Sequence, residues 1–358
     1  MHLELTNWRR FEAEKFNLPE TSLAICDNNG AGKTSILSGI YSLYTTQPWP
    51  DQNLKQCIRH EQSFFGLKNE LIYFVGQLEP SGRLKTKQEF STVEIPELPL
   101  ILVYTPLENQ LLHLSRSKKL DFLDQILSQL HAEYLPKLRK LTKVVQSKQV
   151  LIKRQNEEGL AVDPVLLETL NQHLWDLTTY FWKVRLDFLN FWKENLGQLN
   201  QWLNLTLHDF DLKYLVTQDS FIKTTLLNET DLGNYPGQSL FGHIWNRELA
   251  ANRVLWGSQR DDFEILLNGE PITEILSRGE MRLLVLWLKY LGLRYSREKL
   301  HLQRKVWWFL DDAFNELDSK REEILIDNIL SQVDWYVITT TKSQKICPNY
   351  ELERLRIL

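Results

Sequence analysis

The segment 27–34, with the sequence DNNGAGKT, carries the residue types that bind a chain of phosphates. It matches the pattern G-x-x-x-x-G-K-[ST] at every fixed position except the first. Backbone N–H groups at a helix N-terminus can cradle phosphates, while Lys33 reaches the β and γ oxygens and the Thr34 hydroxyl ligates Mg²⁺. The segment therefore predicts a site for ATP and Mg. Its predicted ATP-binding residues are Asp27, Asn28, Asn29, Gly30, Ala31, Gly32, Lys33, Thr34 and Ser35.

Asp27 stands where this pattern has its first glycine. Glycine permits a sharp turn there, and aspartate adopts such backbone angles only at a cost. Its carboxylate would also add negative charge beside a polyphosphate. We therefore expect Asp27→Gly to tighten nucleotide binding, unless the carboxylate accepts backbone hydrogen bonds that shape the loop.

Two aspartates follow the apolar run Val306–Leu310. A buried strand with this ending can deliver Asp311 to the shell of Mg²⁺ and Asp312 to the attacking water, with Lys33 as the second catalytic residue. Taken alone, the pair is equally well explained as the cap of the next helix.

A third candidate element precedes a strongly apolar helix at 283–293. Its residues are Ser277, Arg278, Gly279 and Glu280. A serine and a glycine at a helix N-terminus form an anion site that suits the γ-phosphate held by another subunit. In isolation a plain N-cap is the better interpretation, so the order of the three motifs along the chain makes the prediction specific.

The elements around these motifs predict an α/β fold. A strand ends just before the phosphate loop and a helix starts at Lys33, which argues against an ordinary glycine-rich turn. The predicted strands lie within 2–26 and at 71–75, 98–104, 203–207, 306–310 and 336–339, and the predicted helices lie at 33–43 and within 117–202. We therefore expect a discontinuous head with a helical arm between its two parts. The predicted domains are residues 1–110, 111–255 and 256–358.

The stretch 137–154 holds seven basic residues and no acidic one. Such a segment can contact the phosphates of DNA, although a charge run alone is more often a solvated helix face. The predicted DNA contacts are Lys137, Lys140, Lys143 and Lys148.

Composition limits the class of protein. The 358 residues have a formal net charge of −4, so DNA binding requires a local basic surface. Three cysteines lie far apart, which argues against disulfides and a zinc site. No apolar run approaches the roughly 18 residues that cross a bilayer, and the first residues lack a signal-peptide pattern. We therefore expect a cytoplasmic protein without a membrane span.

The ordered motifs resemble the ABC-type ATPases of the SMC/Rad50/RecF group, and in their particular residues they are similar to the RecF family. The residues that carry the resemblance are Thr6-Asn7-Trp8-Arg9, Gly257 to Phe263, Leu267-Asn268-Gly269, Asp311-Asp312, Glu316-Leu317-Asp318 and Thr339 to Thr341, with the helical region 115–154. The resemblance implies that Arg9 contacts the nucleotide, that Asp318 belongs to the D-loop, and that Thr340 occupies the position of a switch histidine. Besides Asp27, the departures are Gln259 for histidine, Glu280 for glutamine and Asn315 for serine, and they bear on nucleotide affinity and turnover more than on fold.

The resemblance also implies a function. It implies an ATP-dependent, weakly hydrolysing DNA-binding protein that forms a homodimer around two nucleotides. It further implies action at single-strand/double-strand junctions of gapped and double-stranded DNA, with a RecR-like mediator protein, to help load a recombinase. Two alternatives are the nucleotide-binding subunit of a membrane transporter and an ATP-gated DNA clamp that does not hydrolyse ATP.

Overall fold

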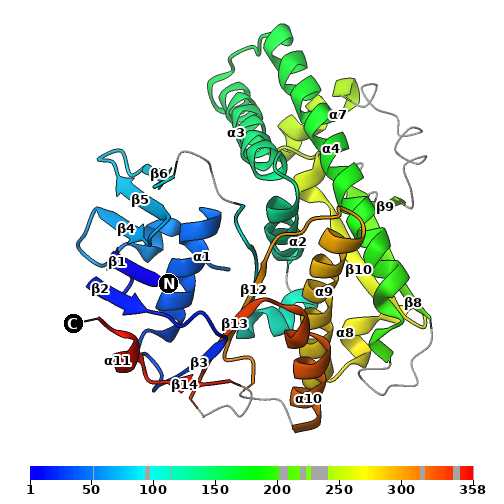
Figure 1. Ribbon diagram of the computed structural model, residues 1–358. Helices are drawn as coiled ribbons and strands as arrows, with labels where there is room; N and C mark the ends of the chain where they lie inside the picture. The colour runs from blue at the N-terminus through cyan, green and yellow to red at the C-terminus, as the bar shows by residue number, and fades with distance from the viewer. Residues whose placement is uncertain are drawn as a thin grey trace. The chain divides into compact units, whose positions relative to one another are not determined.

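The structure is a computed structural model (Figure 1). It describes residues 1–50, 52–92, 97–113, 115–200, 209–217, 223–226, 241–314, 319–341 and 347–357. Three features predicted from the sequence lie outside these ranges: the strand at 203–207, the Asn315 departure and the D-loop residue Asp318.

The chain divides into two compact units. The head unit comprises Met1–Asn109 and His301–Leu358, and the helical unit comprises Gln110–Leu300. The phosphate loop and the Asp311-Asp312 pair thus share the head unit, while Ser277 belongs to the helical unit. The three domains predicted from the sequence remain a proposal.

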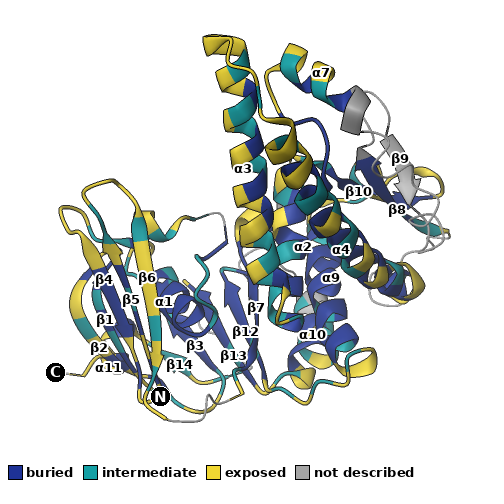
Figure 2. Cartoon of the chain, turned by 90° about the horizontal axis from the view of Figure 1, so that it is seen from above, coloured by how far each residue is buried: buried dark blue, intermediate teal, exposed yellow. Residues whose placement is uncertain are grey.

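A parallel sheet forms the centre of the head unit, in the strand order β14-β3-β13-β12-β7. The strands are β3 (Leu23–Cys26), β7 (Leu100–Tyr104), β12 (Val306–Asp311), β13 (Trp335–Thr340) and β14 (Asn349–Tyr350). Their apolar side chains are largely buried, as expected of parallel strands that are covered on both faces (Figure 2). Since all the pairings are parallel, β3, β12 and β13 bring their carboxyl ends, and with them the loop and Asp311, to one edge.

An antiparallel sheet completes the head unit, in the order β2-β1-β4-β5-β6. Its strands are β1 (His2–Trp8), β2 (Phe11–Asn17), β4 (Phe64–Lys68), β5 (Ile72–Leu78) and β6 (Leu84–Phe90). Helix α1 (Lys33–Thr45) packs with this sheet into one hydrophobic core. The indole of Trp8 donates to the Ser35 carbonyl at 3.0 Å, which ties β1 to the first turn of α1. The short elements of the unit are η1 (Leu54–Cys57), α10 (Ser319–Asn328), η5 (Leu330–Gln332) and α11 (Leu352–Leu355), while η2 (Pro106–His113) starts in this unit and ends in the helical unit.

The helical unit contains the predicted arm. Its helices are α2 (Arg116–Leu130), α3 (Tyr134–Glu158), α4 (Pro164–Leu196), α7 (Phe241–Ala251), α8 (Ile272–Ile275) and α9 (Arg278–Glu298), with η4 at Ser258–Arg260. Helix α4 starts as the sequence predicts, because the Asp163 carboxylate accepts from the Val165 N–H at 2.9 Å and Pro164 occupies the first turn. A sheet in the order β11-β10-β8-β9 packs with the helices, from β8 (Phe210–Thr217), β9 (Lys223–Leu226), β10 (Asp262–Leu267) and β11 (Glu270–Pro271).

A buried polar network joins the helices and strands of this unit. The Arg185 guanidinium, which is 1% exposed, donates to Asp124 at 2.8 Å and to the Ser258 carbonyl at 2.8 Å. Asp261 accepts from Tyr214 at 2.6 Å and from Trp182 at 2.9 Å. Among the described helices, none is long and apolar enough to span a bilayer.

Candidate nucleotide-binding site

The phosphate loop has the backbone that close approach to phosphates requires. Gly30 and Gly32 have φ of 81° and 113°, in the region that disfavours side chains. A Cβ at Gly32 would also lie 2.6 Å from Cζ of Phe11. Residues 28–30 are exposed, whereas Ser35 is buried in the first turn of α1 and its N–H donates to the Gly32 carbonyl at 2.9 Å. The loop therefore leads into the start of a 13-residue helix, whose first-turn N–H groups can bind phosphates.

Lys33 lies along this loop. Its ammonium donates to the carbonyls of Asp27 at 2.6 Å and Asn28 at 3.0 Å, and the residue is 6% exposed. Both acceptors are backbone carbonyls, and within the described residues the ammonium has no carboxylate partner. The lysine is thus positioned for an anionic ligand of the loop.

Thr34 and Asp311 meet although 277 residues separate them. The Thr34 hydroxyl lies 2.9 Å from each carboxylate oxygen of Asp311, and the Thr339 hydroxyl donates to the same carboxylate. Burial raises the pKa of the Asp311 carboxyl, although the hydrogen bonds from Thr339 and Thr34 act in the opposite direction. The three side chains form an oxygen cluster at the edge of the sheet beside the loop.

Thr339 was not among the predicted site residues. Besides contacting Asp311, its hydroxyl accepts from the Asp312 N–H at 3.1 Å, and its carbonyl accepts from the same N–H at 3.1 Å. Asp312 itself has φ of 50°, an uncommon value for a residue other than glycine. The sequence signal was the run of threonines at 339–341, but the role depends on the register of β12 with β13, which spacing does not reveal.

Arg9 has a side-chain donor without a partner. The backbone of Arg9 has a φ of 52°. The Arg9 backbone N–H donates to the Cys57 carbonyl at 2.7 Å, and this bond fixes the turn between β1 and β2. The Nη1 atom is buried and has no hydrogen-bond partner within the described residues. The charge of Arg9 also acts to lower the pKa of Asp311, so the guanidinium lies near the oxygen cluster. A ligand phosphate would satisfy this donor.

Asp27 supports the backbone around the loop. Its carboxylate accepts from the Asn28 N–H at 2.7 Å and from the Leu352 N–H at 3.4 Å. Asp27 is not among the residues with positive φ in the described part of the chain. The backbone strain expected from the sequence is therefore absent, and the contacts favour the alternative in which the carboxylate shapes the loop.

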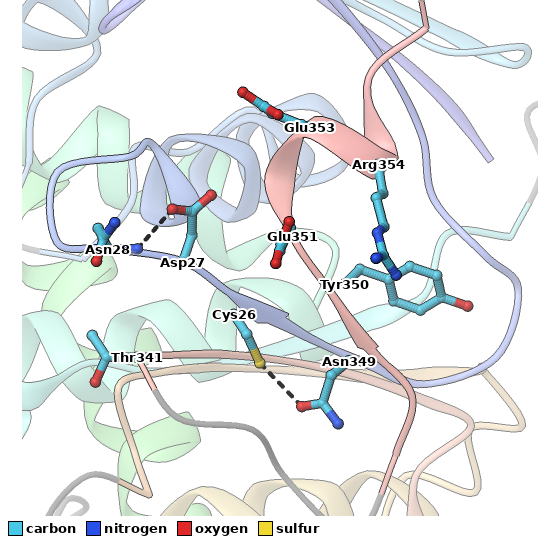
Figure 3. Close-up of a pocket in the computed structure, with 9 residues that line it drawn as sticks. All are labelled: Cys26, Asp27, Asn28, Thr341, Asn349, Tyr350, Glu351, Glu353 and Arg354. Carbon is cyan, nitrogen blue, oxygen red and sulfur yellow. Dashed lines mark hydrogen bonds between the residues drawn. The ribbon is translucent and has the colours of Figure 1, made fainter.

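The predicted switch position, Thr340, lies at the end of β13. It is buried, as Thr339 is, and its carbonyl accepts from the Asp27 N–H at 3.2 Å. Its role as the switch stays a prediction. Thr341, the next residue, is exposed and lines a cavity of about 580 Å³ together with Asp27 and Asn28 (Figure 3). The other wall of the cavity comes from the segment 349–354.

In the helical unit, Ser277 caps α9. Its hydroxyl accepts from the Glu280 N–H at 3.4 Å, and its own N–H donates to the Glu280 carboxylate at 2.8 Å, which is a capping box. The capping box thus explains why glutamate stands at position 280 in place of glutamine. Ser277 and Arg278 are exposed, and Gly279 completes the first turn.

Comparison with known proteins finds relatives that match nearly the whole chain. No protein-family model matches the sequence. The chain is 25% identical over 349 residues to the DNA replication and repair protein RecF of Acholeplasma laidlawii (strain PG-8A), over 94% of this chain and 92% of the relative. It is 24% identical over 348 residues to RecF of Bacillus pumilus (strain SAFR-032), over 95% of this chain and 92% of the relative. The chain is thus similar to RecF proteins along nearly its whole length.

Solved structures agree on the fold. A solved structure of the recombination mediator protein RecF with ATP, in the RecFOR pathway, matches with a TM-score of 0.76 and 20% sequence identity, over 96% of this chain and 92% of that one. A second structure of the same protein, with ATPrS, matches with a TM-score of 0.74 over 97% and 93% of the two chains. The chain therefore has the fold of an ABC-type P-loop ATPase head with a helical arm.

The basic residues predicted to contact DNA lie on α3. Lys140 and Lys143 are exposed, while Lys137 pairs with Glu133 at 2.6 Å and lies over the Tyr180 ring. Lys148 is 1% exposed and pairs with the buried Glu248 at 2.7 Å. The prediction for Lys148 is therefore wrong, because α3 is buried along one side (Figure 2) and Lys148 is on that side.

Proposed function

We propose that the chain binds ATP with Mg²⁺ on the phosphate loop and uses it to control DNA binding in recombinational repair and replication. The observation that carries the proposal is the contact between Thr34 and Asp311 beside Lys33, which donates to two backbone carbonyls. A loop, a lysine and a hydroxyl–carboxylate pair in this arrangement are the parts of a phosphoryl-transfer site.

Each residue has a defined role in this site. The loop N–H groups and Lys33 bind the phosphates, and Arg9 Nη1 contributes a further donor. Asp312 orients the attacking water from the end of β12. Because the Asp312 N–H is bonded twice to Thr339, the strand end that carries Asp312 is fixed.

The oxygen cluster fits Mg²⁺. Thr34 and Asp311 offer a hydroxyl and a carboxylate 2.9 Å apart, and Mg²⁺ takes one or two protein oxygens with phosphates and waters. Within the described residues, no group of three or more His, Cys, Asp or Glu forms a metal site, so a protein-only metal cage is not part of the proposal. Bound Mg²⁺ would neutralise charge on the phosphates during transfer.

ATP is proposed to drive dimerisation. The exposed end of α9, from Ser277 to Glu280, would contact the nucleotide held by a second copy, with Asp318 contributing from the D-loop. The helix N-terminus carries partial positive charge, which suits a γ-phosphate. Hydrolysis would be slow and would release the dimer.

The wider role rests on the relatives. The proposed targets are double-stranded and gapped DNA at single-strand/double-strand junctions, and the proposed partners are a RecR-like mediator and the recombinase that it helps to load. A role on chromosomal DNA would place the protein in the cytoplasm.

The test is DNA binding by the full chain on gapped, duplex and single-stranded DNA, with and without ATP and Mg²⁺. ATP-dependent binding that is strongest on gapped DNA supports the proposal. DNA binding that is the same with and without ATP contradicts it. Single-turnover hydrolysis separates a slow ATPase from a non-hydrolysing clamp. Nucleotide-dependent association with membrane proteins, in place of DNA, would favour a transporter subunit.

A further inference from the structure

The turn between β1 and β2 packs against the phosphate loop. Trp8 pairs with Phe11 across the two strands, so Arg9 and Arg10 are the two residues of the turn. A Cβ at Gly32 would lie 3.0 Å from Cδ of Arg10 and 2.6 Å from Cζ of Phe11. Gly32 is the N-cap residue of α1. The aliphatic stem of Arg10 therefore lies on the loop at the point where the helix begins.

The two residues that flank the turn hold it in place. The indole of Trp8 is fully buried and donates to the Ser35 carbonyl, in the first turn of α1, at 3.0 Å. The Phe11 ring is also buried and packs edge-on against Phe16, with ring centroids 5.3 Å apart. Because both flanking side chains are fixed, the backbone of Arg10 has a fixed place beside the loop.

The guanidinium of Arg10 is available to a ligand. The residue is exposed, and within the described part of the chain its guanidinium makes no hydrogen bond or ion pair. Glu12, the acid nearest to it in sequence, pairs with Arg59 at 3.0 Å. An arginine whose stem lies on the protein and whose charged end is solvated can reorient that end without moving the backbone.

Arg9 and Arg10 reach different parts of the candidate site. The Nη1 atom of Arg9 is buried without a partner among the described residues, and the charge of Arg9 acts on Asp311 in the oxygen cluster. Arg10 instead lies on Gly32, at the N-terminal end of α1. A ligand that runs from the oxygen cluster to the start of α1 would therefore meet a guanidinium at each end.

Charge and geometry favour a phosphate chain as the partner of Arg10. A triphosphate carries more negative charge than one Mg²⁺ and Lys33 can neutralise together. Phosphates bound by the first N–H groups of α1 lie next to Gly32, and thus next to the stem of Arg10. A guanidinium also matches phosphate, because two parallel N–H donors can meet two oxygens.

We infer that Arg10 is a further nucleotide-binding residue, whose guanidinium pairs with the phosphates held at the start of α1. The inference rests on the proposed ATP-binding function and adds a contact that the phosphate-loop motif does not include. Because the β1–β2 turn and the loop both belong to the head unit, a single chain can form this contact. The contact proposed for Ser277, in comparison, requires a second copy.

The test removes the charge and keeps the stem. Arg10→Met retains an unbranched side chain against Gly32, and isothermal titration calorimetry with ATP and Mg²⁺ is expected to show a rise in Kd of about 3- to 10-fold at low salt. The rise should become smaller at high salt, because an exposed charge is screened. Arg10→Lys, which keeps the charge but loses the planar fork, should recover part of the affinity.

Arg83→Met is the matched control. Arg83 is exposed and lies in the hairpin between β5 and β6, at the other edge of the antiparallel sheet from β2. Its replacement is expected to leave the Kd for ATP unchanged. Thermal unfolding of the ligand-free chain should be the same for the natural chain and Arg10→Met, which excludes a loss of fold as the cause of weaker binding.

The outcomes separate the contact from the wider function. Titrations with tripolyphosphate and Mg²⁺ should show the same loss in Arg10→Met as those with ATP, and a loss with ATP alone would overturn the inference, since Arg10 would then contact the nucleoside. A loss that does not change with salt would also overturn it, because it would point to packing of the stem. If the natural chain binds ATP and Arg10→Met binds it equally well, the inference fails while the proposed function stands. If the natural chain binds neither ligand, both fail.

Discussion

Asp27 departs from the phosphate-loop motif but stabilises the backbone of the loop. Its two carboxylate oxygens reach the N–H groups of Asn28 and Leu352, one in the loop and one in the C-terminal segment. A glycine at this position would leave both N–H groups without these acceptors and would loosen the chain. The structure therefore reverses the sign expected from charge alone.

We expect Asp27→Gly to weaken ATP binding by about 1 kcal/mol, a several-fold rise in Kd, because a local backbone hydrogen bond is worth about that much. Asp27→Asn, which keeps one acceptor, should lose less. Titration with ATP and Mg²⁺ at two salt concentrations measures the effect. Tighter binding by the glycine variant would restore the electrostatic explanation.

Thr339 links the two acids of the site. Replacing it by valine keeps the shape of a fully buried side chain but removes the hydroxyl that contacts Asp311 and the Asp312 N–H. We expect Thr339→Val to lower Mg²⁺-dependent ATP hydrolysis by about 10- to 100-fold, as loss of a group that orients a metal ligand usually does. Single-turnover hydrolysis is the measurement. Thr339→Ser should recover most of the rate, and an unchanged rate in the valine variant would remove Thr339 from the site.

At the scale of helices and strands, the capping box at the start of α9 separates two interpretations of Ser277. As a cap, the serine stabilises the helix; as part of a dimer contact, it must stay small and exposed. Both Ser277→Ala and Ser277→Arg remove the cap, at a cost of about 1 kcal/mol in the free energy of unfolding.

The two variants should differ in assembly. We expect Ser277→Arg to block ATP-dependent dimerisation, because a bulky cation at the helix end obstructs an opposing nucleotide site, and Ser277→Ala to dimerise. Sedimentation velocity with ATP and Mg²⁺ compares them. Normal dimers in the arginine variant would show that this helix end only caps α9.

The lysines of helix α3 have two roles, one on the surface and one in a buried ion pair. Lys140 and Lys143 are exposed, whereas Lys148 pairs with Glu248 in the interior. Replacing both exposed lysines by glutamine should weaken duplex binding and lower its salt slope by about two units.

Lys148→Gln should instead lower the free energy of unfolding by about 3–5 kcal/mol, because it leaves a buried carboxylate without its partner. Denaturant unfolding tests this, with Lys148→Gln combined with Glu248→Gln as the control, which should recover part of the loss.

The sequence predicted the elements that local pattern determines. The apolar runs of the parallel strands and the loop between β3 and α1 are readable because burial on both faces and a phosphate-binding turn each require particular residues. Lys148 was misjudged because its partner Glu248 is 100 positions away, so a charge count along α3 cannot find it. The role of Thr339 was missed for the same reason, because it depends on pairing between distant segments, which local periodicity does not encode.

For the whole molecule, the division into two units determines what ATP can change. Residues of the candidate ATP site, including Lys33, Asp311 and Thr339, belong to the head unit, whereas Ser277 belongs to the helical unit. Binding of ATP to one chain should therefore order the head unit alone, and dimerisation should add protection at the start of α9.

We expect hydrogen exchange to resolve these two steps by protein concentration. Below the dimerisation range, ATP and Mg²⁺ should slow exchange at 27–34 and 339–341 and leave 277–281 unchanged. Within that range, 277–281 should slow as well, because the second copy then covers the helix end. Lys33→Ala should abolish both effects, and Ser277→Arg should abolish only the second. Protection of 277–281 by ATP in the dilute chain would contradict this scheme, since it would mean that a single chain closes its own site.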